Sequence, residues 1–159
     1  MATRRTRLRI GVIAAVAAAV AVSAAVWSGT GVASSRQLTK TPTVTTRKVG
    51  KLGVILVNGA GHTLYMFVRD KQKKVTCTGS CAVIWPPLKL KSGQKPTAGG
   101  AAKKSLLGMD GRVVTYNKWP LYTYITDHKP GQATGQAINN SGGLWYVLSP
   151  SGKVIKKKP

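Results

Sequence analysis

The strongest constraint on the fold is a short pattern that occurs twice, 57 residues apart (122 − 65). The first copy reads TLYMFVRD over residues 63–70, and the second reads PLYTYITD over residues 120–127. Each copy places a tyrosine, a second aromatic residue and an aspartate at the same spacing. An indole follows each copy, at Trp85 and Trp145. The chain is therefore predicted to contain two copies of one structural unit, with insertions and deletions confined to its loops.

Each copy has the residue pattern of β-strands. Residues 54–57 are apolar and mostly β-branched, residues 58–61 read Asn-Gly-Ala-Gly, and residues 62–68 continue as a second strand. Asn and Gly accept the positive φ angles of tight turns, so these segments predict a β-hairpin. Both faces of the strand at 62–68 carry apolar or aromatic side chains, which indicates a central strand. In the second copy, residues 112–116 and 121–125 are the corresponding strands, with a connection at 117–120.

These units predict an all-β domain over residues 51–157, preceded by an N-terminal hydrophobic helix. Repeat one covers 51–90, a loop covers 91–105 and repeat two covers 106–157. In each repeat the Trp-bearing segment is expected to be the third strand. Two such three-stranded units are too small to bury separate cores, so they are expected to form one small sandwich or barrel. Its bulkiest core residues are predicted at the matched positions: Tyr65, Phe67, Trp85, Tyr122, Tyr124 and Trp145.

The N-terminus has the layout of an export signal. Residues 1–9 contain four Arg, and residues 10–27 are apolar apart from Gly11 and Ser23. Residues 1–34 are thus predicted to be either a cleaved signal peptide or a membrane anchor formed by residues 10–27. Residues 35–50, rich in Thr and basic side chains, are expected to be a flexible linker. The folded domain is accordingly expected to be extracytoplasmic, either secreted or anchored.

The charge is strongly one-sided, with 25 Lys and Arg against 3 Asp and Glu. Such a chain attracts polyanions, which include cell-wall polymers, anionic lipid headgroups and nucleic acid. The basic residues are scattered, and no helix, zinc finger or RNA-binding aromatic motif would present them to bases, so specific nucleic-acid binding is not expected. The expected partner is an anionic envelope polymer or membrane surface, with a protein partner as a further possibility.

Two readings apply to the paired acids, Asp70 and Asp127. Each follows an aromatic strand by three residues, where its carboxylate can accept hydrogen bonds from the next backbone N–H groups and fix the turn. The alternative is a catalytic carboxylate pair of the kind used in glycoside hydrolysis. That pair needs one acid kept protonated near neutral pH, and a cationic environment opposes this. We therefore expect structural aspartates, no cofactor and no enzymatic activity.

The two cysteines also allow two readings. Cys77 and Cys81 lie close together in an exported chain, and the short loop with Gly79 between them favours a disulfide. Alternatively, they form an extracytoplasmic copper-binding or thiol-redox site, with His62 and His128 as further ligands.

The two motifs, together with the segments at 76–88 and 142–146, resemble a family of secreted repeats of unknown function. Its members are predicted bacterial lipoproteins. They are recognised by a six-residue motif: Tyr, any residue, an aromatic residue, any two residues and Asp. The resemblance covers roughly residues 47–155 and implies no particular activity. Because no Cys lies between positions 20 and 40, lipidation of an N-terminal Cys is excluded here. Together, the export signal, the cationic charge and the lack of a recognisable catalytic set predict an exported, non-enzymatic protein of the cell envelope.

Overall fold

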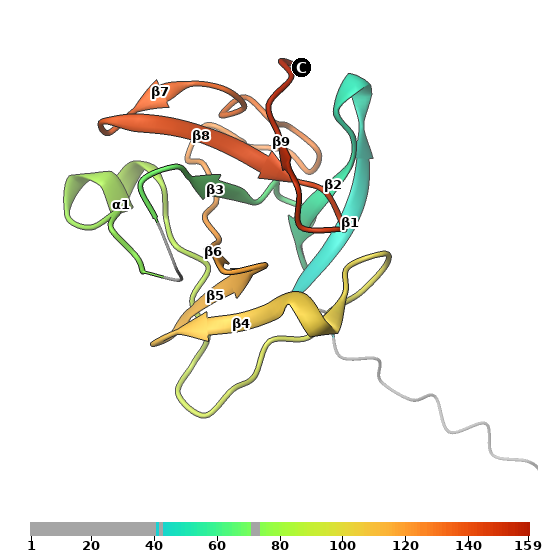
Figure 1. Cartoon of the computed structure of the whole chain (residues 1–159), viewed down its shortest axis with the longest axis vertical. Coiled ribbons are helices and arrows are strands. Elements are labelled where there is room, and N and C mark those ends of the chain that lie inside the picture. The colour runs from blue at the N-terminus through green and yellow to red at the C-terminus, as the bar shows by residue number, and fades with distance from the viewer. Residues whose placement is uncertain (1–40, 42, 71–73) are drawn as a thin grey trace, which may run out of the picture. The chain divides into compact units, whose positions relative to one another are not determined.

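The computed structural model describes residues 41, 43–70 and 74–159 of the chain (Figure 1). These residues belong to the unit Leu38–Pro159, one of two units into which the chain divides. The predicted signal or anchor at 1–34, including its hydrophobic helix, lies outside the described residues. Within the described ranges, no helix is both long and apolar enough to cross a membrane.

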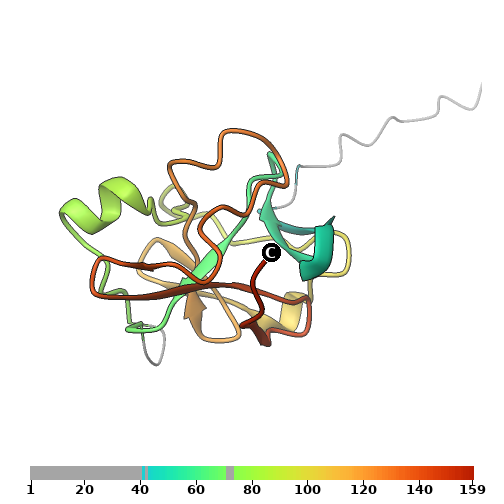
Figure 2. The ribbon, with the colours of Figure 1, turned by 90° about the horizontal axis from the view of Figure 1, so that it is seen from above.

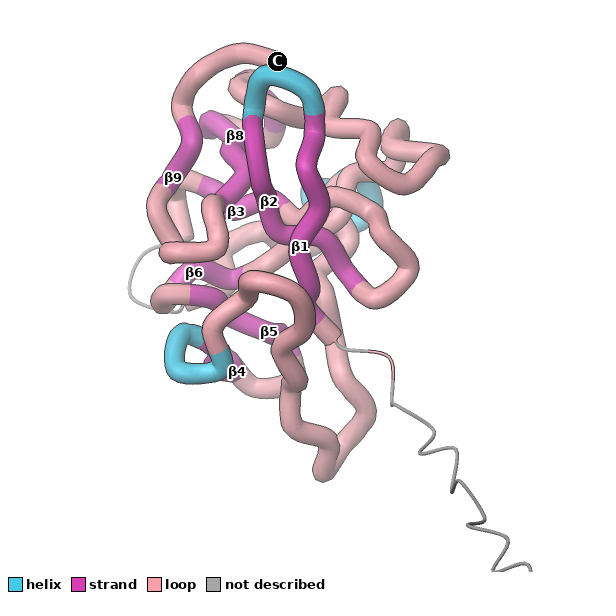
Figure 3. Tube along the Cα trace, turned by 90° about the vertical axis from the view of Figure 1, so that its right-hand side faces the viewer, coloured by secondary structure: helices cyan, strands magenta, loops and turns pink. Residues whose placement is uncertain are grey.

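The first sheet is a hairpin that corrects the predicted domain boundary. Strands β1 (Val44–Val49) and β2 (Gly53–Asn58) are antiparallel and are joined by the 3-10 turn η1 (Gly50–Leu52) (Figure 3). β1 lies inside residues 35–50, which were expected to be a flexible linker. Its sequence, VTTRKV, is rich in β-branched residues that suit a strand, and Val44 is fully buried. The folded domain therefore begins before residue 51.

The second sheet contains the first motif. β3 (Tyr65–Phe67) and β7 (Asn139–Asn140) flank β8 (Gly143–Leu148), and β9 (Val154–Ile155) also pairs with β8. The predicted turn at Asn58 is present, because its side-chain oxygen accepts hydrogen bonds from the N–H groups of Ala60 and His62. The predicted hairpin after it is present but short: the N–H of Asn58 donates to the carbonyl of His62 at 2.8 Å, and the N–H of Leu64 donates to the carbonyl of Leu56 at 3.0 Å. The longer ladders are made elsewhere, since β2 pairs with β1 and β3 pairs with β8. A single bridge, Val57 to Thr63, joins the two predicted arms.

The third sheet carries the start of repeat two. It consists of β4 (Leu107–Asp110), β5 (Val113–Tyr116) and β6 (Trp119–Pro120), and the 3-10 turn η2 (Lys104–Leu106) precedes it. The strand predicted at 112–116 is thus confirmed in β5. The segment 121–125 is not a regular strand. Instead, Tyr122 forms isolated bridges to Tyr65 and Pro87.

The first repeat has a helix where a Trp-bearing strand was predicted. Residues Ser80–Ile84 form the short helix α1, and Trp85 follows directly as its C-cap. In the second repeat the equivalent Trp145 does lie in a strand, β8. The disulfide loop in the first repeat explains the difference, since it turns the chain tightly before Trp85. α1 and the β1–β2 hairpin lie at opposite ends of the folded unit (Figures 1 and 2).

The hydrophobic interior has two parts, which share β3. The two apolar faces predicted for this strand are observed: Tyr65 and Phe67 enter one cluster, and Leu64 and Met66 enter the other. Within the described ranges the strands form separate sheets linked by isolated bridges, and they do not close into a barrel. The all-β class is therefore correct in outline. In the part of the chain that the structure describes, the expected pair of three-stranded repeats is replaced by three sheets, of which the one that contains β3 and β8 combines strands from both repeats.

Candidate functional site

The equivalent tyrosines of the two motifs pair with each other. The N–H of Tyr65 donates to the carbonyl of Tyr122 at 2.8 Å, and the N–H of Tyr122 donates to the carbonyl of Tyr65 at 3.0 Å. An exchange of this kind between equivalent residues is the pattern that a two-fold axis imposes. The two repeats are thus related locally by an approximate two-fold axis that passes between these tyrosines.

The hydroxyls of the same tyrosines cross to the aspartates of the opposite repeat. The hydroxyl of Tyr65 donates to Oδ2 of Asp127 at 2.6 Å, and the hydroxyl of Tyr122 donates to Oδ2 of Asp70 at 2.5 Å. All four side chains are buried. Each motif therefore supplies a donor to the other motif and an acceptor for it. We call these two contacts the crossed tyrosine–aspartate pairs.

A threonine of the same repeat donates hydrogen bonds to the second oxygen of each carboxylate. Oδ1 of Asp70 accepts hydrogen bonds from the backbone N–H and the hydroxyl of Thr76, at 2.8 and 2.6 Å. Oδ1 of Asp127 accepts the same two bonds from Thr134, at 2.9 and 2.6 Å. Each aspartate was expected to bond to the next N–H groups along the chain. Instead, it reaches across its loop, which the threonine contact closes.

These contacts determine what the carboxylates can do. Each buried carboxylate accepts from a phenol, a threonine hydroxyl and a backbone N–H, and such donors offset the cost of removing it from water. Its oxygens are occupied by protein groups, and Asp70 and Asp127 are only 0 % and 5 % exposed. The arrangement therefore suits holding two loops and two repeats together.

Burial makes both crossed tyrosines weaker acids. Desolvation is the main cause that raises the pKa of Tyr65 far above its ordinary value, and the hydrogen bond to Asp127 adds to it. Desolvation and the hydrogen bond to Asp70 raise the pKa of Tyr122 in the same way. Hydrogen bonds from backbone N–H groups act in the opposite direction and lower each pKa. These groups belong to equivalent positions of the two repeats, Gly135 for Tyr65 and Cys77 for Tyr122. The neutral phenol is thus strongly favoured in the folded protein.

The other aromatic side chains of the motifs form a continuous stack. The two indoles, Trp85 and Trp145, lie parallel with ring centroids 3.8 Å apart. Phe67 stacks on Trp145 at 4.2 Å, and Tyr124 stacks on Trp85 at 4.1 Å. Successive rings in the stack, in the order Phe67, Trp145, Trp85 and Tyr124, therefore come from alternate repeats. This interleaving buries the aromatic residues of each repeat against those of the other.

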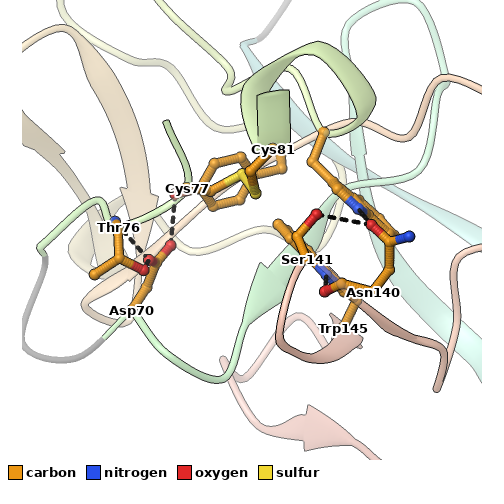
Figure 4. Close-up of a disulfide and its surroundings, with 9 residues drawn as sticks. Asp70, Thr76, Cys77, Cys81, Asn140, Ser141 and Trp145 are labelled. Carbon is orange, nitrogen blue, oxygen red and sulfur yellow. Dashed lines mark hydrogen bonds between the residues drawn. A yellow bond between two sulfur atoms is a disulfide. The ribbon is translucent and has the colours of Figure 1, made fainter. Parts of the chain in front are cut away.

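Both indole N–H groups donate hydrogen bonds to Asn140. Trp85 Nε1 donates to the side-chain oxygen of Asn140, and Trp145 Nε1 donates to its backbone carbonyl, both at 3.0 Å. The hydroxyl of Ser141 also bonds to the Asn140 side-chain oxygen (Figure 4). A single residue of repeat two thus satisfies the polar atoms of two buried indoles.

The disulfide lies next to one of the crossed pairs. Cys77 and Cys81 are joined, as predicted, and the bond ties the chain after Thr76 to helix α1 (Figure 4). Repeat two has Gly135 where repeat one has Cys77. A Cβ on Gly135 would lie 2.6 Å from the ring of Trp85, so the stack leaves no room for a side chain there. The aromatic stack therefore excludes a second cysteine from this position.

The alternative copper or thiol site is not assembled. Both cysteines are in the disulfide, while Nδ1 of His62 bonds to the carbonyl of Asp127 and His128 is exposed. Within the described part of the chain, no three His, Cys, Asp or Glu side chains gather in a way that could hold a metal ion. The structure does not bring Cys77, Cys81, His62 and His128 together.

The third acid of the chain, Asp110, has a different setting. It lies beside the disulfide, in the lining of a pocket of about 310 Å³ that also includes Lys89. Its Oδ2 accepts a hydrogen bond from the N–H of Val75 at 2.9 Å. Asp110 is half-buried and belongs to neither crossed pair.

Several residues of the site were not identified from the sequence. Thr76 and Thr134 follow their aspartates by six and seven residues. Aligning the two repeats with a one-residue gap after the aspartate would have placed Thr76 opposite Thr134. Asn140 has no counterpart in repeat one and gave no such signal. The crossing of the tyrosines to the opposite repeat cannot be read from either motif alone.

The fold and these contacts define a protein made of two interlocked copies of one β-rich unit. A family model described as a secreted repeat of unknown function matches residues 45–89 and 107–149, one match in each repeat. The two matches cover more than half of the chain, and the chain belongs to this family. No curated protein and no solved structure matches it.

Removing either crossed hydroxyl tests its contribution to stability. Tyr65→Phe and Tyr122→Phe should each lower the free energy of unfolding by about 1–3 kcal/mol, because each leaves a buried carboxylate short of one donor. Thermal or denaturant unfolding measures the change. Tyr124→Phe is the matched control, because its ring lies in the stack but its hydroxyl is not among the donors to either carboxylate, and it should change stability much less. Equal effects of all three substitutions would contradict the role of the crossed pairs.

The raised tyrosine pKa values predict sensitivity to alkali. Because the folded state favours the neutral phenols, their stabilisation is complete below the ordinary tyrosine pKa of about 10. It is lost as the pH rises above that value, since the unfolded chain then releases protons that the folded chain retains. Stability measured at increasing pH should therefore fall more steeply for the wild type than for Tyr65→Phe/Tyr122→Phe. Parallel curves for the two proteins would contradict this assignment.

Proposed function

We propose that this protein is an exported, non-enzymatic binding module that adsorbs to anionic polymers of the cell envelope through its cationic surface. Membership of a secreted family supports export. The binding role rests on how the structure distributes its few acids and many bases.

The observation that carries the proposal is the position of the acids. Asp70 and Asp127, two of the three acids in the whole chain, are buried in the crossed pairs. Asp110 is the remaining acid, and it is half-buried. The described residues include 17 Lys and Arg, and none of these is buried. The water-facing surface is therefore almost without negative charge.

The basic residues are spread over the domain. They occur on the β1–β2 hairpin, in the loop after Leu88, near β5 and in the C-terminal tail. The tail is held in place by Gln136, whose Nε2 donates to the carbonyls of Ile155 and Lys157 at 2.6 and 2.8 Å. Lys156, Lys157 and Lys158 are exposed beside these contacts. Scattered cations of this kind favour extended polyanions over a compact ligand.

The proposal assigns no catalytic role to the motif. The two aspartates that would form a hydrolytic pair are buried, and their oxygens bond to Tyr, Thr and backbone donors. A general acid or base must reach the proton that it transfers, and these groups face the interior. The motif is better explained by its role in joining the repeats.

Binding to a soluble polyanion tests the proposal. The protein should bind immobilised polyphosphate at low ionic strength, and its affinity should fall roughly tenfold or more as salt is raised to about 1 M, where the Debye length is about 3 Å. Two triple variants remove the same charge from two places and should weaken binding to a similar degree. They are Lys156→Gln/Lys157→Gln/Lys158→Gln and Lys89→Gln/Lys91→Gln/Lys95→Gln. Uncharged dextran is the control matrix. Absence of binding at low salt, or binding that high salt leaves unchanged, would overturn the proposal.

A further inference from the structure

Two aliphatic side chains are exposed at neighbouring points of the surface. Val83, on α1, is 67 % exposed, and Ile125, in the second motif, is 54 % exposed. The two segments that carry them are adjacent, since the N–H of Ile125 donates to the carbonyl of Ile84, the residue after Val83, at 3.1 Å. Half-buried Tyr124 precedes Ile125. We call Val83, Tyr124 and Ile125 the apolar corner.

The apolar corner is held rigidly. The disulfide ties α1 to Cys77, which is buried in the core. Tyr124 is stacked on Trp85, the residue that follows α1. A binding partner would therefore pay little entropy to order these side chains.

The segments that form the apolar corner carry no charge. Residues 78–88 and 119–126 contain neither acidic nor basic side chains, in a chain with 25 Lys and Arg. This corner could enter an apolar environment without removing a charge from water. A surface that is cationic elsewhere and apolar at one corner matches the interface of an anionic membrane, where apolar groups insert and cations meet headgroups.

We propose that the apolar corner inserts shallowly into the headgroup region of a bilayer that contains anionic lipid. This inference rests on the proposed function and narrows the anionic surface to a lipid one. The aromatic ring of Tyr124 suits the interface between water and lipid. A standard protein interface buries about 800 Å² on each partner and needs a complementary surface. Three side chains offer far less than that, whereas a membrane requires no complementary shape.

Vesicle binding tests the inference with the unit Leu38–Pro159, which lacks the apolar segment at 10–27. Every residue of the two core clusters lies within this unit, so it carries its own interior. The unit should bind vesicles of phosphatidylcholine with phosphatidylglycerol and should bind pure phosphatidylcholine vesicles much more weakly. Val83→Ser/Ile125→Ser should lower the partition coefficient by roughly tenfold, since two exposed aliphatic groups no longer leave water.

Val54→Ser is the matched control. Val54 is 43 % exposed and belongs to β2, and the β1–β2 hairpin lies at the end of the folded unit opposite α1 (Figure 1). The Val54→Ser variant should bind vesicles as the wild type does, and melting curves should show that all variants fold. None of these substitutions alters the net charge, so binding to polyphosphate should be unchanged.

Two outcomes would overturn the inference. One is wild-type partitioning of Val83→Ser/Ile125→Ser, which would show that charge alone drives vesicle binding. The other is a wild type that binds polyphosphate but not anionic vesicles, which would leave the proposed function intact and remove the lipid assignment of the apolar corner. Failure to bind either probe would count against the proposed function itself.

Discussion

The crossed hydrogen bonds between each motif tyrosine and the aspartate of the opposite repeat are the interaction on which the rest of the structure depends. A buried carboxylate is stable only if its hydrogen bonds are made, and here one donor always comes from the other repeat. The indoles follow the same rule, because each stacks between aromatic rings that belong to the opposite repeat. Neither repeat has a complete interior without its partner.

This architecture also explains why the surface of the domain carries almost no negative charge. Only three acids are present, and the two in the motifs are used inside the fold. The surface is then free to carry Lys and Arg with almost no opposing charge, which suits an exported protein that meets anionic polymers or lipids. The motif and the cationic surface therefore have separate roles. The first holds the repeats together, and the second provides the binding that we propose.

The duplicated pattern predicted the all-β class and the aromatic core positions, and the close spacing of two cysteines in an exported chain predicted the disulfide, because these features depend on local spacing and residue type. It did not predict β1, because VTTRKV lies in a basic, Thr-rich stretch that resembles a linker until Val44 is seen in the core. It also missed α1, where the disulfide loop changes the backbone of repeat one before Trp85. The crossed pairing could not be read from the sequence, since a tyrosine gives the same local signal whichever aspartate it contacts.

The claim that each repeat completes the other is tested most directly by dividing the chain. A cut between Gly93 and Gln94, in an exposed turn, separates the two motifs and leaves both cysteines in one fragment. NMR spectra of residues 38–93 and 94–159 alone should show unfolded chains, and an equimolar mixture should show the dispersed spectrum of the intact domain. A native-like spectrum from either fragment alone would contradict this account.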